Sequence, residues 1–478
     1  MRFFHTFAIV LAATVGLAGG VVHAKPKVEL GIDVLAANQF RGLEGKRVGL
    51  ITNQTGVSAS GRSTVDILKD APNVNLVALY APEHGVYGAE LAGDYVASTK
   101  DARTGLPVFS LYGPSRKPTP AMLKDIDVLV YDIQDIGCRS YTYISTMGLA
   151  MEAAGEAGIE FYVLDRPNPL NGNRVEGMPL DPKFRSFVGQ WDIPYVYGLT
   201  PGELARMINA QKWITARPKL TIVPMRGWYR NMYWEDTGLS WVPTSPHIPT
   251  ADTSLFYVIT GLVGEGMPVN HGIGYTLPFQ LLGREDFHAF TLADQLNGLK
   301  LPGVYFRPAF YKPFYGSLKD KMCQGVQVIL TDPDQVNLTN LSVLLLEQLQ
   351  KYTGGRFFSK EVAPTTKGPS LFDKVAGGDD LRLHFTAGKP AASLIASWQA
   401  NLAAFRQLRE PYLIYQNRPT VVSVPAPTPS ASTKPNVEPK PVPKVEPKTK
   451  KTEKPAVKPA APKPATPAAS TPAPNTTP

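Results

Sequence analysis

The run Leu-Val-Ala-Leu-Tyr at residues 76–80 continues directly into Ala-Pro-Glu-His-Gly at residues 81–85. An apolar run of this length predicts a buried strand, and the Pro- and Gly-containing stretch after it predicts the loop at the strand's carboxyl end. Apolar runs also precede Tyr-Asp-Ile-Gln-Asp-Ile-Gly at residues 131–137 and Asp-Arg-Pro-Asn-Pro at residues 165–169. Three strands are therefore expected to end in acids, amides, a histidine and an arginine.

These polar strand ends predict a binding site. In an open α/β sheet, ligands collect in the crevice outside the carboxyl ends of the strands. Burying so many polar groups without partners would cost several kcal/mol, which makes a purely structural role the weaker interpretation. We therefore expect one polar site built from distant parts of the chain.

Alternation of strand and helix patterns sets the expected fold class, which is α/β. Strands separated by helices indicate βαβ units and a parallel sheet, so a Rossmann-like N-terminal domain is predicted. A nucleotide is not implied, because GxGxxG does not follow the first strand and GxxxxGK[ST] occurs nowhere. The expected strands are residues 47–52, 76–80, 108–111, 128–131 and 159–164, and the expected helices are residues 63–69, 120–125 and 142–155.

The second half of the chain predicts a smaller α+β domain, with a cleft between the two domains. Residues 168–191 are rich in Pro, Gly and Asn and are interpreted as the crossover. Thr200 and Glu203 have the spacing of a capping box at the start of a helix. The expected domains are residues 25–190 and 191–423. Further strands are expected at residues 220–224 and 325–331, and further helices at residues 199–209, 338–352 and 391–409.

The two ends of the chain do not resemble folded domains. Residues 1–24 combine Arg2, an apolar stretch and Val-His-Ala, which is typical of a secretory signal peptide; a membrane anchor is the alternative. Residues 424–478 are mostly Pro, Ala, Lys and Thr and predict a disordered tail. We therefore expect an exported protein, periplasmic or extracellular.

The tail also carries most of the net charge. Residues 425–478 contribute six of the chain's nine net positive charges. The excess of positive charge therefore does not lie on the folded part as a nucleic-acid binding surface would, and no nucleic-acid partner is expected. A cationic tail would associate with anionic envelope polymers or membrane surfaces, although a solvated spacer explains it equally well. Cys138 and Cys323 could pair in an exported protein, but their spacing suits neither zinc nor redox chemistry.

Several motifs stand in one order along the chain. They are Gly31-Ile32-Asp33, Lys-Arg-Val-Gly-Leu-Ile-Thr-Asn-Gln-Thr-Gly at residues 46–56, Pro-Glu-His-Gly at residues 82–85, Asp132 to Gly137 with Tyr141-Thr142-Tyr143, and residues 165–169. Together they resemble the NamZ-type exo-β-N-acetylmuramidases, a family long labelled only as a domain of unknown function, over roughly residues 31–415. The resemblance implies hydrolysis of a terminal β-1,4-linked N-acetylmuramic acid from the non-reducing end of peptidoglycan fragments.

Glycoside hydrolysis usually needs two carboxyl groups, an acid for the leaving oxygen and a base or nucleophile. Glu83 is the leading acid, because it follows a strand between Pro82 and His84-Gly85 and because the resemblance implies the same residue. The alternative is that Glu83 caps a helix or pairs with an arginine. Candidates for the second carboxylate are, in order, Asp135, Glu265 and Asp132, and Glu265 rests on the resemblance alone.

Other polar and aromatic residues near these acids are candidates for binding substrate. Asn53 and Gln54 would hydrogen-bond sugar hydroxyls or an acetamido group. Arg139 or Arg166 would receive the lactyl carboxylate of muramic acid, because a guanidinium forks onto a carboxylate. Tyr141 and Tyr143 would stack on sugar faces or pack in the cleft wall, and His84 would tune the pKa of Glu83, bind substrate or be structural. Gln134, Asp165 and His271 complete the expected site, with Asp165 and Arg166 as a possible ion pair that fixes the loop.

The chain departs from the family pattern at two places. His-Gly-Ile-Gly-Tyr at residues 271–275 stands where the family usually has Glu-Gly-Arg-Gly-Thr, and His247 follows Ser-Pro where the family has Asn. These changes put the substrate in doubt, not the fold. One alternative function is therefore a non-catalytic, exported wall-sugar binding protein.

Two further alternatives remain open. One is a hydrolase of another class that uses a metal held by Glu83, His84, Asp132 and Asp135, although no HExxH-like spacing occurs. The other is a scaffold that holds partners through the tail. The preferred hypothesis requires no cofactor and takes muropeptides or MurNAc-GlcNAc as substrates; the sequence does not fix the oligomeric state.

Overall fold

The computed structural model describes residues 28–355, 362 and 368–419. The expected signal peptide at residues 1–24 and the expected tail at residues 424–478 lie outside the described residues. No helix among the described residues has the length and apolar character needed to cross a bilayer.

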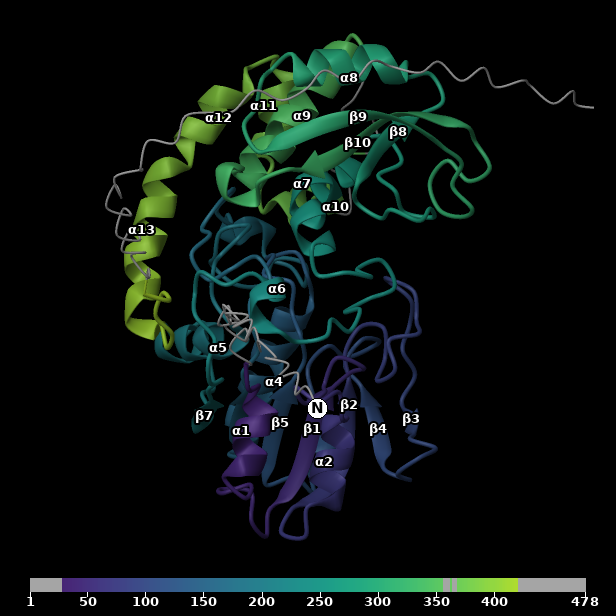
Figure 1. The fold of residues 1–478 in the computed structure, drawn as a ribbon. Coiled ribbons are helices and arrows are strands. Elements are labelled where there is room, and N and C mark those ends of the chain that lie inside the picture. The colour runs from purple at the N-terminus through teal and green to yellow at the C-terminus, as the bar shows by residue number, and fades with distance from the viewer. Residues whose placement is uncertain (1–27, 356–361, 363–367, 420–478) are drawn as a thin grey trace, which may run out of the picture. The chain divides into compact units, whose positions relative to one another are not determined.

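The N-terminal part is built on a seven-stranded sheet in the order β3-β4-β2-β1-β5-β6-β7, with all neighbours parallel except the short pair β3 and β4 (Figure 1). Without β3, this is the order of the classic doubly wound fold, and it reverses between β1 and β5. The predicted α/β class and Rossmann-like topology are confirmed. The strands are β1 (Arg47–Thr52), β2 (Asn75–Ala81), β3 (Thr99–Lys100), β4 (Pro107–Ser110), β5 (Val128–Asp132), β6 (Glu160–Leu164) and β7 (Leu220–Val223).

Alternate side chains of the central strands build two separate cores, one on each face of the sheet. In β5, Val128 and Val130 pack in one core, while Leu129 and Tyr131 pack in the other. This follows from the two-residue period of a strand, and burial of both faces explains the unbroken apolar runs in the sequence. Helices cover the sheet: α1 (Gly31–Ala37), α2 (Thr64–Asp70), α3 (Pro120–Leu123), α4 (Tyr143–Ala157) and α5 (Pro201–Ala210).

Two helix starts fix the carboxyl end of β6. A Cβ on Gly31 would collide with the backbone of Leu164 and Asp165, so only glycine lets α1 begin against this strand end. The predicted capping box at the start of α5 is present, with the Thr200 hydroxyl accepting from the Glu203 N–H and the Glu203 carboxylate accepting from the Thr200 N–H. The close packing of Gly31 and the hydrogen bonds that Thr200 and Gly202 donate to Asp165 hold the polar strand end in one place.

The C-terminal part contains a three-stranded antiparallel sheet in the order β8-β10-β9 and a set of helices (Figure 1). The helix expected at residues 391–409 is broken at Trp398 into two. The strands are β8 (Leu281–Arg284), β9 (Val304–Tyr311) and β10 (Cys323–Leu330). The helices are α6 (Trp234–Thr237), α7 (Thr253–Gly266), α8 (Ala289–Asn297), α9 (Leu338–Tyr352), α10 (Leu371–Ala376), α11 (Asp380–Thr386), α12 (Ala391–Ser397) and α13 (Gln399–Arg409), with 3-10 turns at η1 (Pro182–Phe184), η2 (Pro333–Gln335) and η4 (Glu410–Tyr412).

The first sheet extends past the boundary expected between residues 190 and 191, because β7 pairs with β6. The end of the folded chain also returns to this sheet. Tyr415 donates a 2.6 Å hydrogen bond to Asp165, and the Arg409 guanidinium binds the carbonyl of Gly198 at 2.7 Å. Cys138 and Cys323 are both buried and unbonded, so they do not form the possible disulfide.

Candidate active site

Glu83 lies two residues beyond the end of β2, and its carboxylate is held from two directions. Oε2 accepts a 2.6 Å hydrogen bond from the hydroxyl of Thr142, and Oε1 accepts a 3.0 Å hydrogen bond from the Gly93 N–H. His84 and Gly85 both have left-handed backbone, with φ of 70° and 78°, so the chain turns sharply after the glutamate. Glu83 forms no ion pair with any arginine that the structure describes, which removes that alternative role.

Three tyrosines surround this carboxylate. The hydroxyl of Tyr112 lies beside it, and burial together with the charge of Glu83 raises the pKa of Tyr112 to about 12. Tyr141 and Tyr143 are almost fully buried and bind Thr244 through their hydroxyls, at 2.8 Å to Oγ1 and 2.6 Å to the carbonyl oxygen respectively. Their ring faces therefore do not offer the expected open stacking surface, and they anchor the loop of Thr244 instead.

His84 is held by the loop that follows it. Its Nδ1 donates a 2.7 Å hydrogen bond to the carbonyl of Glu90. Burial, with a smaller contribution from nearby His84, lowers the pKa of His247, and His247 Nε2 lies 2.9 Å from the hydroxyl of Tyr315. His84 is thus a fixed neighbour of Glu83. It also lies near His247, one of the positions where the chain departs from the family pattern.

Amides occupy the point where the strand order reverses. Asn53 Oδ1 accepts a 2.9 Å hydrogen bond from the Thr55 N–H, and the Thr55 hydroxyl accepts one of 2.9 Å from the Gln134 N–H. Gln54 Nε2 donates to the carbonyls of Pro243 and Thr244 at 2.8 and 3.1 Å. These contacts tie the loops after β1 and β5 to each other and to the loop that carries Thr244.

Four polar atoms in these loops are buried without a hydrogen-bond partner in the part of the chain that the structure describes. They are Asn53 Nδ2, Gln54 Oε1, Gln134 Oε1 and Asp135 Oδ2. Because buried polar atoms are almost always paired, such a cluster indicates where a polar ligand or ordered water completes the structure. It contains both donors and acceptors, which suits hydroxyl and amide groups.

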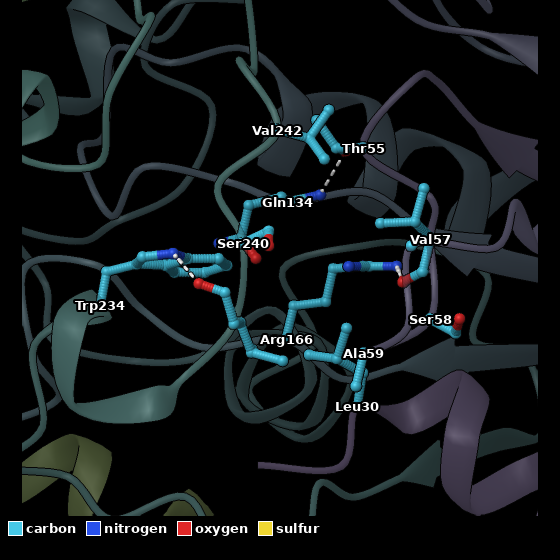
Figure 2. Close-up of a pocket in the computed structure, with 12 residues that line it drawn as sticks. Leu30, Thr55, Val57, Ser58, Ala59, Gln134, Arg166, Trp234, Ser240 and Val242 are labelled. Atoms are coloured by element: carbon cyan, nitrogen blue, oxygen red, sulfur yellow. Dashed lines mark hydrogen bonds between the residues drawn. The ribbon is translucent and has the colours of Figure 1, made fainter. Parts of the chain in front are cut away.

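Figure 2 shows a small cavity beside these loops, with Gln134 and Thr55 on one side and Arg166, Val57 and Trp234 around it. Its volume of about 40 Å³ accommodates ordered water but not a sugar ring. The Arg166 guanidinium donates to the Val57 carbonyl at 2.8 Å. This cavity therefore does not bind a saccharide. The residues around it hold the loops of the site in place.

Asp135 has one carboxyl oxygen bound and one free. Oδ1 accepts from the Gly137 N–H at 2.7 Å and from the Tyr197 hydroxyl at 3.0 Å, while Oδ2 is unpaired among the described residues. Burial raises the pKa of Asp135 to about 7. Burial also raises the pKa of Tyr141, with smaller contributions from the charges of Asp135 and Glu83. Both acids are therefore close neighbours of the same tyrosine.

Asp132 and Arg166 were expected in the site, but they bind each other. Arg166 donates to the two oxygens of Asp132 at 2.5 and 3.0 Å, and Thr64 also donates to Asp132. Both side chains are about 2% exposed or less. The Asp132 carboxylate is therefore held by Arg166 and Thr64, which favours a structural role for this pair over the catalytic role expected for Asp132.

Asp165 and Arg139 are also committed to the fold. Asp165 accepts from the Gly202 N–H at the start of α5 and from the hydroxyls of Thr200 and Tyr415, and burial raises its pKa to about 6. The guanidinium of Arg139 is buried and donates to four backbone carbonyls, and this burial lowers its pKa to about 10. Neither residue is free to bind substrate as expected. The four carbonyls belong to Met178, Ile193, Val375 and Ala376.

Glu265 and His271 lie in the C-terminal part. Glu265 is in the last turn of α7, where it keeps accessible surface while surrounding protein raises its carboxyl pKa. The charge of Glu265 also contributes to the raised pKa of Tyr257, whose ring lies 5.9 Å from that of Tyr141. His271 packs against Phe279, and burial lowers its pKa to about 4, so it is neutral at pH 7. Glu265 thus acts electrostatically on Tyr257, the tyrosine whose ring packs against that of Tyr141.

Tyr112 and Thr142 were missed in the sequence. Tyr112 lies two residues after β4, the strand next to β2, so the rule that found the other strand ends would also have found it. Thr142 lies in the motif Tyr141-Thr142-Tyr143, but the sequence did not predict it as a site residue, since a threonine before a helix usually caps that helix. Among the described residues, no group of three or more His, Cys, Asp or Glu side chains is arranged to hold a metal ion.

Comparison with known proteins agrees with this architecture. The chain belongs to the exo-β-N-acetylmuramidase NamZ family: the N-terminal domain of that family matches residues 48–252, and its C-terminal domain matches residues 255–415. Over 391 residues the chain is 44% identical to the peptidoglycan β-N-acetylmuramidase NamZ of Bacillus subtilis (strain 168), which covers 82% of this chain and 92% of that protein.

Two crystal structures of DUF1343 family proteins from Bacteroides fragilis NCTC 9343 have the same fold. One is 47% identical with a TM-score of 0.77, and the match covers 82% of this chain and 100% of that one. The other is 31% identical with a TM-score of 0.67, at the same coverage of both chains.

Proposed function

We propose that this protein is an exo-acting glycoside hydrolase that releases terminal β-1,4-linked N-acetylmuramic acid from the non-reducing end of peptidoglycan fragments, with Glu83 as general acid. The observation that carries this proposal is the position of Glu83 beside the reversal point of the sheet, with its carboxylate oriented by Thr142 and Gly93. Family membership and the 44% identity to a peptidoglycan β-N-acetylmuramidase support the reaction and its substrate class.

The second carboxyl group in this proposal is Asp135. Its Oδ2 has no partner among the described residues, it neighbours the same tyrosine as Glu83, and a pKa of about 7 lets it exchange a proton near neutral pH. Glu265 is the alternative, acting from the C-terminal side. Replacing each by its amide separates them, because only the true partner's replacement lowers kcat by a factor of ~10² or more.

The unpaired amide atoms supply the substrate contacts in this proposal. Asn53 Nδ2 would donate to a sugar oxygen, and the carbonyl oxygens of Gln54 and Gln134 would accept from hydroxyl groups or from the acetamido N–H. Contacts on three loops hold these side chains, and the loops would have to part for a sugar to reach the unpaired atoms, because these atoms have almost no solvent-exposed surface.

The test uses the disaccharide MurNAc-GlcNAc and a trisaccharide in which a further N-acetylglucosamine caps the muramic acid. The wild-type protein should release N-acetylmuramic acid from the disaccharide and leave the capped trisaccharide intact. Glu83→Gln should lose activity by ~10² or more, whereas Glu285→Gln, an exposed glutamate on the second sheet's side, should retain it. Cleavage of the capped trisaccharide would refute the exo mode, and full activity of Glu83→Gln would refute the assignment of the acid.

A second function, a wall-sugar binding protein without turnover, is favoured by one observation. The histidine that replaces the family's usual glutamate, His271, is neutral at pH 7 and its Nδ1 is unpaired among the described residues. Binding of N-acetylmuramic acid without any release from the disaccharide would support this function instead.

Export to the periplasm or the cell exterior is also proposed, from residues 1–24, whose charged start, apolar stretch and Val-His-Ala end suit a signal peptide. The lysine-rich residues 425–478 would then associate with anionic envelope polymers. Salt-dependent retention on isolated cell walls, lost when residues 424–478 are deleted, tests the role of the tail.

A further inference from the structure

Arg116 is an exposed arginine whose guanidinium is held by aromatic rings. Its Cζ lies 4.3 Å from the ring centroid of Phe187 and 5.1 Å from that of Tyr112, and the two rings are 5.8 Å apart. Stacking of this kind restrains a long side chain that would otherwise sample many rotamers. The planar fork of donors is therefore kept in one region of the surface.

The charge of Arg116 is not neutralised by the fold. It forms no ion pair and no hydrogen bond with any residue that the structure describes, and its side chain is exposed to solvent. Arg139 and Arg166, by contrast, are buried: the two terminal nitrogens of Arg139 donate to backbone carbonyls, and Arg166 binds Asp132 and the Val57 carbonyl. Arg116 thus has a guanidinium that is available to a ligand, unlike Arg139 and Arg166, the two arginines expected to bind the carboxylate.

One tyrosine joins Arg116 to the proposed acid. The ring of Tyr112 contacts the guanidinium, and its hydroxyl lies beside the Glu83 carboxylate. The two charges act on this hydroxyl in opposite directions, since Glu83 raises the pKa of Tyr112 and Arg116 lowers it. Arg116 and Glu83 therefore both lie against the same aromatic side chain, the guanidinium at its ring and the carboxylate at its hydroxyl.

N-acetylmuramic acid differs from N-acetylglucosamine by a lactyl ether that ends in a carboxylate. We propose that Arg116 receives this carboxylate and thereby sets the preference for terminal N-acetylmuramic acid over N-acetylglucosamine; this rests on the proposed function, which supplies the substrate class. Arginine binds a carboxylate through two parallel N–H···O contacts, which gives both strength and orientation. The sugar would then lie with its lactyl side toward Arg116 and its glycosidic oxygen toward Glu83.

The test compares Arg116→Ala and Arg116→Lys with the wild type on three chromogenic glycosides: the β-N-acetylmuramide, the same compound with its lactyl carboxylate converted to a methyl amide, and the β-N-acetylglucosaminide. Arg116→Ala should lower kcat/KM for the muramide by about 10- to 100-fold and leave the other two glycosides unchanged. Arg116→Lys should retain part of the preference, because the charge remains but the fork is lost. The kcat/KM of Arg116→Ala on the methyl amide should be no lower than that of Arg116→Ala on the muramide or of the wild type on the methyl amide.

Controls separate recognition from stability. Arg307→Ala, which removes an exposed arginine whose guanidinium binds Gln327 on the second sheet, should change neither rate nor preference. An equal loss on all three glycosides by Arg116→Ala, or an unchanged preference for the muramide, would overturn the inference.

Binding of the free sugars keeps the inference distinct from the proposed function. By calorimetry, Arg116→Ala should bind N-acetylmuramic acid at least ~10-fold more weakly than the wild type and bind N-acetylglucosamine equally well. A wild-type protein that shows this Arg116-dependent preference but hydrolyses nothing would refute the hydrolase function and support the receptor role of Arg116. Equal affinity of the wild type for both sugars would refute the receptor role.

Discussion

The hydroxyl of Thr142 donates a 2.6 Å hydrogen bond to Glu83 and so joins the residue before α4 to the turn after β2. The two residues are 59 positions apart in the sequence, and the bond is buried. With the Gly93 N–H, it fixes the rotamer of a carboxylate that immediately precedes the left-handed turn at His84 and Gly85. Orientation of the acid is therefore built into the contact between a strand end and a helix start.

Thr142→Val is expected to lower kcat by about 10-fold and to lower the unfolding midpoint by a few degrees. Valine keeps the shape of threonine but cannot orient Glu83, and the loss of one hydrogen bond to a charged group costs about 1.5–3 kcal/mol. Rates on MurNAc-GlcNAc and thermal unfolding are the measurements. Thr146→Val is the matched control, since its hydroxyl is buried on the same helix without a partner among the described residues. A similar loss of activity in both variants would argue against a specific role for Thr142.

Asp135→Asn is expected to change the pH dependence of stability. The pKa of Asp135 is raised from its ordinary value of 3.8 to about 7 in the folded protein, so between these pH values the folded protein holds a proton that the unfolded chain has released. The stabilisation linked to this proton is complete below the unfolded pKa and is lost as pH rises through 7. Relative to wild type, the asparagine variant should therefore gain stability from pH 4 to 7, by at most about 1.4 kcal/mol per pH unit.

Urea unfolding of both proteins at several pH values measures this difference. A constant difference across pH 4–7 would mean that Asp135 ionises normally in the folded protein. Activity of the same variant on the disaccharide reports separately on the catalytic role proposed for Asp135.

Arg166→Met is expected to destabilise the protein strongly. It leaves the buried Asp132 carboxylate without its bidentate partner, and breaking a buried pair in this way costs about 3–5 kcal/mol. The variant that replaces both residues, Asp132→Asn with Arg166→Met, should recover part of this loss, because no charge remains buried. Chemical denaturation gives both values. A stable Arg166→Met variant with greatly weakened sugar binding would instead restore Arg166 as a substrate-binding residue.

The central sheet was predictable because burial on both faces leaves a direct trace in the sequence. The apolar runs at residues 47–52, 76–80 and 128–131 match β1, β2 and β5 to within one residue at each end. In contrast, α7 was not predicted as a helix. The residues of α7 are apolar on almost every side of the helix. Such a segment lacks the apolar–polar periodicity that distinguishes a helix from a strand in the sequence.

The site was predictable in position but not in the role of each residue. Strand ends alone located Glu83, Asp135 and the amides. Whether an acid is free or paired depends on contacts that the sequence does not display: Asp132 meets Arg166 across 34 positions, and Arg139 reaches Ala376 across 237. The sequence therefore predicts Arg139 and Arg166 as substrate ligands. It gives no such indication for Arg116, which has no acidic neighbour in the sequence.

The leaving-group dependence of Glu83→Gln tests the role of Glu83 most directly. A general acid matters when the departing oxygen is basic and matters little when it is not. The variant should lose a factor of ~10²–10⁴ in kcat on MurNAc-GlcNAc, but less than about 10-fold on the 2,4-dinitrophenyl β-muramide, whose leaving group needs no proton. Equal losses on the two substrates, or no loss on the disaccharide, would contradict the assignment of Glu83 as the acid.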